Sequence, residues 1–344
     1  MRTVIPGASA VALCLAGGLG VLHAADPRPI TFAVIRGDGI LIPFATRTGD
    51  KWTLTWPVPL KKPDVPLGID EVPKRWWGKL GPTTTWHAWT IDGAASEVRV
   101  ERPEWYLARC QQGVGLKTAL TARPPVPPPT LQPYPKLGLA ATAPLPFRAV
   151  EVLDESAPLW GAIRTAVATA LNRAEDGMKR TPLQIANGGG FFHPFGPEER
   201  AKVPVRLESL YRIPLGDGRL LHFFEATKRY GMPPLAAGER SPAETPRDGC
   251  GLMAFAYGWL VVGPGETLGE PDLRAELTAC DYGGSVLMLP LGYLPDTRGA
   301  LWFAQETSWD TEAYTVLRAD PTTGIPEVLF TTHGGVCPGP NTGW

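Results

Sequence analysis

Residues 205–226, VRLESLYRIPLGDGRLLHFFEA, contain two largely apolar runs on either side of the turn Gly216-Asp217-Gly218. Glycine reaches the positive φ values that a tight turn requires, and Asp-Gly is among the strongest hairpin signals. The runs 205–214 and 219–226 are therefore predicted to be the two strands of a β-hairpin. This pattern of short runs separated by turn residues recurs along much of the chain, and it decides the predicted fold class.

A second hairpin is predicted within residues 30–44, around the turn Gly37-Asp38-Gly39. Apolar and polar residues alternate strictly in 51–56, which indicates a half-buried strand. Further strands are expected at 83–91, 98–102, 114–121, 252–262, 273–280, 286–291, 301–305, 313–319 and 327–331. The segment 273–280 also fits a helix, so its assignment stays open at this point.

One segment has clear helical spacing instead. Its apolar residues recur every three or four positions, as Leu159, Ile163, Val167, Leu171 and Ala174. This spacing predicts an amphipathic helix near 156–176 that packs on a sheet. Ser156 or Asp154 is the expected N-cap, and Pro158 suits the first helical turn.

The composition supports the same fold class. The 344 residues include 39 glycines, 38 prolines and 12 tryptophans, and 44% of the residues are hydrophobic. Glycine and proline punctuate short elements, while aromatic residues favour strands. We therefore expect a mainly β protein with one packed helix. Closely spaced turns in the C-terminal half favour a β-propeller-like arrangement, and a two-domain β-sandwich is the alternative.

Composition also divides the chain into four regions. Residues 1–24 are a predicted signal peptide, 25–122 and 147–344 are β-rich regions, and 123–146 is rich in proline. Such a proline-rich run prefers the extended polyproline II conformation and cannot join the centre of a sheet. It is interpreted either as a stiff linker between two domains or as a loop clamped across one domain.

The N-terminus has the order of a secretory signal. Arg2 precedes an apolar stretch at 11–22, and Ala24-Ala25 follows before Asp26. We expect cleavage after Ala24 or Ala25, with an uncleaved anchor as the alternative. Leucine before Cys14 does not fit a lipidation signal. The predicted location is secreted or periplasmic, without membrane insertion after cleavage, because no other stretch approaches the roughly 18 apolar residues of a span.

Removal of the signal leaves four cysteines: Cys110, Cys250, Cys280 and Cys337. An even number in an exported chain predicts two disulfides, and four buried free thiols are the alternative. If 252–262 and 273–279 form a hairpin, Cys250 and Cys280 face each other at its open end. Paired strands place Cα atoms about 5.5 Å apart, which is within disulfide reach. The second pair, Cys110 and Cys337, follows by elimination.

Several function classes lack their sequence signals. The net charge is -1 and no long basic run occurs, so a nucleic-acid partner is not expected. The mature chain has four histidines, His87, His193, His222 and His333. Their spacing in the sequence does not match that of metal ligands. No phosphate-binding loop or G-x-S-x-G motif is present, so the glycine-rich segment 187–193 is interpreted as a loop. No cofactor or metal is expected.

The best carboxylate cluster is Glu306, Asp310 and Glu312, around Trp309. Two carboxyl groups beside an aromatic face are what a glycosidase uses, although a solvated acidic turn has the same composition. A second aromatic group contains Trp76 and Trp77, followed by Trp86, His87 and Trp89. It predicts either a sugar-binding platform or part of the core.

Two function hypotheses follow. The first is an exported protein of the envelope or extracellular space with a non-catalytic binding or structural role, whose partner is a glycan or another envelope protein. It is favoured because the sequence lacks the catalytic signatures described above. The alternative is a secreted glycosidase-type hydrolase that uses the carboxylates near Trp309.

Overall fold

The computed structural model describes residues 28–53, 80–81, 83–91, 93–108, 111–120, 136–177, 193–216, 218–231, 251–278, 280, 285–308, 311–320 and 322–336. Several sequence predictions lie outside these ranges. They include the signal peptide, residues 54–56 of the predicted strand 51–56, the proline-rich part of 123–146 before Lys136, residues 187–192 of the glycine-rich segment, and the residues Trp76, Trp77, Trp309, Asp310, Cys110, Cys250 and Cys337.

The described residues form a mainly β structure, as the sequence predicts. They contain sixteen strands and two α-helices, and the strands form three sheets in which every pairing is antiparallel. The predicted turns at 37–39 and 216–218 each join two paired strands. Gly39 and Gly218 have φ values of 78° and 79°, which explains why glycine occupies these positions.

The N-terminal sheet closes on itself. Its strands are β1 (Ile30–Arg36), β2 (Ile40–Thr48), β3 (Lys51–Thr53), β4 (Thr85–Thr90), β5 (Ala95–Ala108), β6 (Gln111–Thr118) and β7 (Lys136–Ala141). The order is β1-β7-β4-β5-β6-β2-β3, and β1 also pairs with β2. Six strands therefore form a ring, with β3 attached to β2, and we call this unit the closed sheet.

Side chains fill the interior of the closed sheet. All six ring strands contribute to one buried cluster, whose largest member is the fully buried Trp86. The other buried members are Ala33, Ile35, Leu41, Ala88, Val100, Val114, Leu116, Leu137 and Ala140. The ring is thus a packed core, because small and large side chains share its inner space.

The second sheet has five strands in the order β12-β11-β10-β9-β8. They are β8 (Glu151–Val152), β9 (Arg206–Gly216), β10 (Arg219–Tyr230), β11 (Leu252–Val262) and β12 (Asp272–Thr278), and the short 3-10 helix η2 (Pro264–Glu266) lies between β11 and β12. The segment 273–280, which the sequence left open between strand and helix, is largely the strand β12. It pairs with β11 in a regular register from Trp259↔Asp272 to Met253↔Thr278.

The third sheet has four strands in chain order: β13 (Leu287–Leu294), β14 (Leu301–Thr307), β15 (Thr311–Ala319) and β16 (Pro326–Val336). Every residue of β13 is buried, and so is every residue of β14 except Glu306. Strands that are buried along their whole length have no solvent face, so both faces of this sheet must be covered over β13 and β14.

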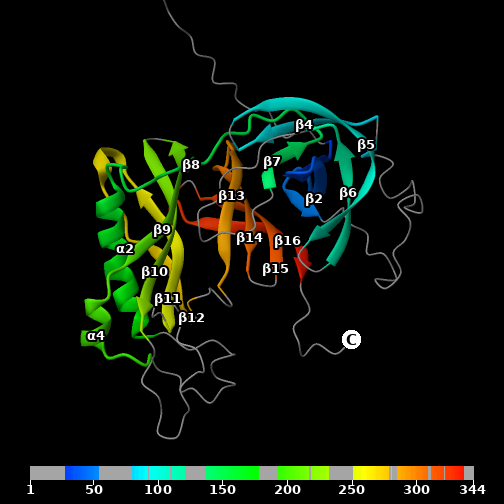
Figure 1. Cartoon of the computed structure of the whole chain (residues 1–344). Coiled ribbons are helices and arrows are strands. Elements are labelled where there is room, and N and C mark those ends of the chain that lie inside the picture. Colours follow the sequence, from blue (N-terminus) through cyan, green and yellow to red (C-terminus); the bar gives the residue numbers. More distant parts are fainter. Residues whose placement is uncertain are drawn as a thin grey trace, which may run out of the picture.

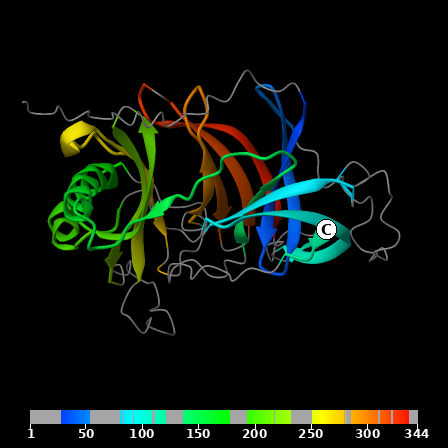
Figure 2. The same cartoon turned by 90° about the horizontal axis from the view of Figure 1, so that it is seen from above.

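The layers are stacked in a row, as Figures 1 and 2 show. Helix α2 (Trp160–Glu175) covers one face of the five-stranded sheet. The other face of that sheet packs on the four-stranded sheet, where Phe223 and Trp302 share one buried cluster. The opposite face of the four-stranded sheet packs on the outside of the closed sheet, where Phe32 and Phe303 lie 5.3 Å apart between ring centroids.

These layers refine the sequence expectations. The mainly β class is confirmed, but neither the propeller-like arrangement nor the two-domain sandwich is confirmed. The C-terminal part of the segment 123–146 is strand β7, which lies between β1 and β4 in the closed sheet. That position ties this part of the segment into the N-terminal sheet.

The helices differ from the expectation in two ways. Helix α2 begins at Trp160, and its N-cap Leu159 makes no side-chain capping bond. Ser156 donates to the Asp154 carboxylate instead, so these two residues form a local turn ahead of the helix. A second, six-residue helix, α4 (Pro197–Lys202), was not predicted because its short polar sequence has no apolar period.

Candidate functional site

The predicted carboxylate pair does not converge in the structure. In the pairing of β14 with β15, Glu306 lies opposite Ala313, while Thr307 lies opposite Glu312. Successive strand residues point to opposite faces of a sheet, so Glu306 and Glu312 face different sides. Glu312 lies on the side of the closed sheet, together with Tyr314, and Glu306 lies on the side of the five-stranded sheet.

Glu312 is part of a buried ion pair rather than a solvated turn. Its Oε1 lies 2.8 Å from Nζ of Lys136, and the two side chains are 7% and 1% exposed. Tyr314 donates its hydroxyl to the same carboxylate. Burial lowers the pKa of Lys136, and the neighbouring Glu312 opposes this effect. The pair joins the first residue of β7 to β15, so it links the closed sheet to the four-stranded sheet.

Glu306 has a different environment. It is partly buried beside Thr315, and burial raises the pKa of its carboxyl group. The predicted aromatic group is also divided between two places. Trp86 lies inside the closed sheet, and Trp89 packs in the cluster on the outside of that sheet. For these two tryptophans the core interpretation is confirmed, and Trp76 and Trp77 lie outside the described residues.

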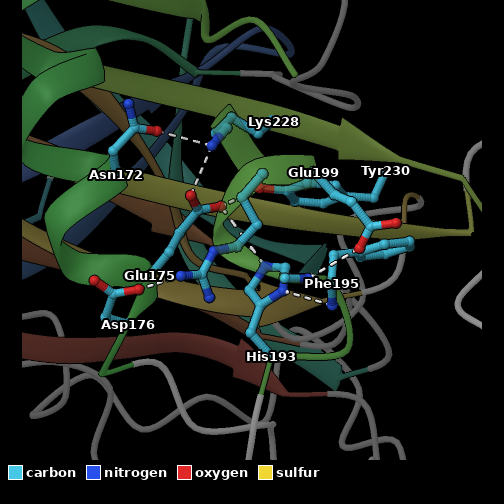
Figure 3. A network of polar contacts seen from close by, with 10 residues as sticks. Asn172, Glu175, Asp176, His193, Phe195, Glu199, Lys228 and Tyr230 are labelled. Atoms are coloured by element: carbon cyan, nitrogen blue, oxygen red, sulfur yellow. Dashed lines mark hydrogen bonds and ion pairs between the residues drawn. The ribbon is translucent and has the colours of Figure 1, made fainter. Parts of the chain in front are cut away.

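A densely connected polar group lies between α2 and β10, and Figure 3 shows it. Glu175, on the last turn of α2, accepts a hydrogen bond of 2.6 Å from Nζ of Lys228 and another from the hydroxyl of Tyr230. Lys228 also donates to Oδ1 of Asn172 at 2.8 Å. Both members of the Lys228–Glu175 ion pair are fully buried. We call these four residues the α2–β10 network.

Electrostatics keep Glu175 ionised in this interior. Burial alone acts to raise the pKa of its carboxyl group, but the neighbouring His193, Lys228 and Tyr230 outweigh burial and lower it. Burial raises the pKa of Tyr230, and the hydrogen bond to the negatively charged Glu175 raises it further. A buried carboxylate that is fully hydrogen-bonded and paired with a cation is the stable arrangement for such a group.

The segment 193–196, which precedes α4, packs against this network. The ring of Phe195 stacks on Tyr230 with centroids 5.0 Å apart, and His193 meets the same ring edge-on. Nδ1 of His193 accepts a hydrogen bond from the backbone N–H of Phe195 at 3.2 Å. Its Nε2 lies 3.7 Å from Glu175, beyond hydrogen-bond distance. Arg200 of α4 forms an ion pair with Asp176, so this segment is fixed against the end of α2.

A third buried carboxyl group, Glu225 on β10, lies between the five-stranded and four-stranded sheets. Ser209 donates to its Oε2 at 2.7 Å, and the backbone N–H of Met288 donates to its Oε1 at 2.8 Å. Complete burial raises its pKa to about 7, and these two hydrogen bonds only partly oppose that effect. Glu225 therefore joins the two sheets through hydrogen bonds.

The sequence contains only partial signals for these groups. Residues 225–230 resemble an ion-paired strand exit, but the i, i+2 spacing of Phe224, Ala226 and Lys228 already puts the lysine on the apolar face of its strand. Glu175 similarly continues the helical stripe of Leu171, four residues later. A charged residue on each of two facing apolar stripes is the pattern that would have indicated a buried pair.

Metal-ligand clusters and membrane-spanning helices are both absent from the part of the chain that the structure describes. None of the described His, Cys, Asp and Glu side chains form a group of three that could hold a metal ion. None of the described helices has both the length and the hydrophobicity of a membrane span.

Comparison with known proteins identifies no relative of this chain. The chain matches no protein-family model, no curated protein and no solved structure.

The Lys136–Glu312 pair yields a stability prediction. Lys136→Met leaves the Glu312 charge buried without its cation, and we expect a loss of about 3–5 kcal/mol in the free energy of unfolding. The double variant Lys136→Met/Glu312→Leu should lose markedly less, because no buried charge remains. Urea denaturation measures both values.

A matched control is the ion pair of Arg173 and Glu270, whose side chains are 71% and 76% exposed. Arg173→Met should change stability by less than about 1 kcal/mol. Equal losses for the single and double variants at Lys136 would contradict the assignment of a buried pair.

Glu225 yields a pH prediction. Its raised pKa means that, between about pH 4.5 and 7, the folded protein holds a proton that the unfolded chain releases. The contribution of protonated Glu225 to the stability of the folded protein is therefore fully present below about pH 4.5. Roughly 3 kcal/mol of this stability is lost as pH rises through 7. Glu225→Gln keeps the bond from Met288 without titrating, so the stability of this variant should fall less between those pH values.

Denaturation curves from about pH 4.5 to 8 test this expectation. Glu270→Gln is the control, because Glu270 is exposed and its replacement should leave the pH profile unchanged. Parallel profiles for the wild type and Glu225→Gln would show that Glu225 does not bind the proton.

Proposed function

We propose that the chain is an exported protein of the envelope or extracellular space with a non-catalytic binding or structural role. The observation that carries this proposal is that the buried charged groups are paired with each other inside the fold. Glu312 is paired with Lys136, and Glu175 is paired with Lys228, in buried positions. Groups held in this way join layers of the fold, whereas a catalytic carboxyl group must reach a substrate.

Export rests on the N-terminal sequence alone. Arg2, the apolar stretch and Ala24-Ala25 have the order of a cleavable signal, which leads to a secreted or periplasmic location. The proposed partner is a glycan or another envelope protein, contacted through the aromatic residues Trp76, Trp77 and Trp309. Aromatic side chains suit such a role because they provide a large contact area with few rotatable bonds.

We also propose that Cys250 pairs with Cys280. Two observations support this pairing: Cys280 is disulfide-bonded, and the register Met253↔Thr278 brings the chain before β11 close to the chain after β12. The second pair is then Cys110 and Cys337. Each bridge would stabilise the fold by roughly 2–4 kcal/mol.

Peptide mapping without reduction tests the pairing. We expect one linked peptide that contains Cys250 and Cys280 and another that contains Cys110 and Cys337. The intact mass should be lower by about four hydrogens than that of the reduced chain. A link from Cys280 to any other cysteine, or four free thiols in the exported protein, would contradict the proposal.

A secreted glycosidase-type hydrolase is the second candidate function. One observation favours it: burial raises the pKa of Glu306, as a general acid requires. Its partner would be Asp310, since Glu312 faces the other side of the sheet and is held by Lys136.

A glycan array with the mature protein, paired with a hydrolysis screen on the same sugars, separates the two functions. We expect saturable binding that Trp309→Ala weakens and no turnover that depends on Glu306. Glu306→Gln removes the acid with little change of shape, and Glu270→Gln is its exposed control. Sugar hydrolysis that is lost in Glu306→Gln and kept in Glu270→Gln would establish the hydrolase and overturn the non-catalytic role.

A further inference from the structure

The α2–β10 network brings three different functional groups to one nitrogen atom. Nζ of Lys228 donates to Oε2 of Glu175 at 2.6 Å and to Oδ1 of Asn172 at 2.8 Å. Figure 3 shows both bonds, and in this view the amide nitrogen of Asn172 points away from Lys228. The side-chain amine of a lysine is therefore in contact with a carboxamide and with a carboxylate at the same time.

The sequence places these groups together through two regular spacings. Asn172 and Glu175 are three residues apart on α2, so they are neighbours on the helix surface. Lys228 follows Phe224 and Ala226 on the face of β10 that packs on the helix. The side chains of Lys228 and Glu175 are fully buried, whereas Asn172 is exposed. The amine is thus held in the interior, and a group released from Asn172 has a route to solvent.

The buried ion pair is a source of a nucleophile. Transfer of one proton along the 2.6 Å hydrogen bond converts the pair into a neutral amine and a carboxylic acid. This transfer removes two charges from an interior where each of them is costly. A neutral lysine amine is a nucleophile, and lysines in apolar surroundings use this property in covalent catalysis. A small neutral fraction is sufficient for a reaction that each chain undergoes only once.

We propose that Lys228 and Asn172 form an isopeptide bond between Nζ and Cγ, with Glu175 carrying the protons and ammonia leaving. Nζ first passes a proton to Glu175 and then attacks Cγ, so that the Nζ–Cγ bond forms and the π electrons of the carbonyl move to Oδ1. Glu175 then transfers a second proton from Nζ to Nδ2. The carbonyl re-forms as the Cγ–Nδ2 bond breaks, and the electron pair of that bond leaves with ammonia.

The atoms and charges of this step balance. The ammonium group of Lys228 loses two protons, of which Glu175 keeps one and the departing ammonia takes the other. A charged pair and a carboxamide become a neutral carboxylic acid, a neutral amide and ammonia. No further reactant is required, and dilution of the ammonia into solvent prevents the reverse reaction. The inference depends only on the folded chain and not on its proposed export or partner.

The position of the three groups favours this reaction over a similar one elsewhere in the fold. Well-oriented groups within one molecule react as if they were present at roughly 10⁵–10⁸ M. Glu175 lies within the distance at which a general acid or base works. Among the described residues, Lys136 has the carboxylate of Glu312 as a hydrogen-bond partner but no carboxamide. Lys136 is therefore an internal control that should stay unmodified.

Peptide mapping of the reduced, denatured mature protein tests the proposal. We expect an intact mass that is lower than the sequence mass by one ammonia molecule, and a branched peptide in which Lys228 is joined to Asn172. Trypsin should cleave after Lys136 but not after Lys228, because an amide-linked lysine is not a trypsin site. A cyclic imide at an asparagine has the same mass loss but joins no second peptide, so the branched peptide distinguishes the two.

Variants assign the roles of the three residues. Asn172→Ala and Lys228→Arg should have the full sequence mass, and Glu175→Gln should leave most chains unlinked, because the proton carrier is lost. Arg173→Met is the control, since this side chain is 71% exposed beside Asn172, and the variant should keep the bond. Asn172→Ala decides if the buried variants do not fold, because Asn172 is exposed.

Three results would overturn the isopeptide bond. The first is a wild-type chain of full sequence mass. The second is the recovery of Asn172 and Lys228 in separate, unlinked peptides. The third is a loss of ammonia that persists in Asn172→Ala, because the leaving nitrogen would then come from another residue.

Discussion

The rest of the structure depends on the burial of strands β13 and β14 of the four-stranded sheet on both faces. One face packs on the closed sheet and the other packs on the five-stranded sheet, which α2 covers in turn. A strand in this position cannot alternate between apolar and polar residues, and β13 is accordingly buried at all eight positions. A polar side chain on these faces is stabilised only where it has a partner inside the protein, because water cannot reach it.

The buried carboxyl groups satisfy this requirement in two ways. Glu312 and Glu175 are each paired with a lysine from another layer, so their charges are compensated. Glu225 has no such cation among the described residues, and burial therefore raises its pKa. In each case the carboxyl group connects two layers of the stack. Their chemistry therefore contributes to the uniqueness of the packing, which is the recognised use of buried polar groups in some proteins.

The parts of the fold that depend on local chemistry were predictable from the sequence. Gly39 and Gly218 mark hairpin turns by themselves, and the stripe from Ile163 to Leu171 identifies a helix. The ring closure was not predictable, because it depends on pairing between β1 and β7, whose residues are far apart in the chain. The role of Glu312 was missed for the same reason: its partner Lys136 belongs to another sheet, and the acidic residues nearby in sequence suggested a solvated loop instead.

Amide hydrogen exchange tests the doubly covered sheet most directly. Amides in regions covered on both sides should exchange only through global unfolding. We predict that the amides of Phe303 and Val316, which are register partners on β14 and β15, exchange among the slowest in the protein. The amides of the edge strand β12, such as Leu273, should exchange faster. Equal protection of Phe303 and Leu273, or faster exchange at Phe303, would contradict a structure organised around the four-stranded sheet.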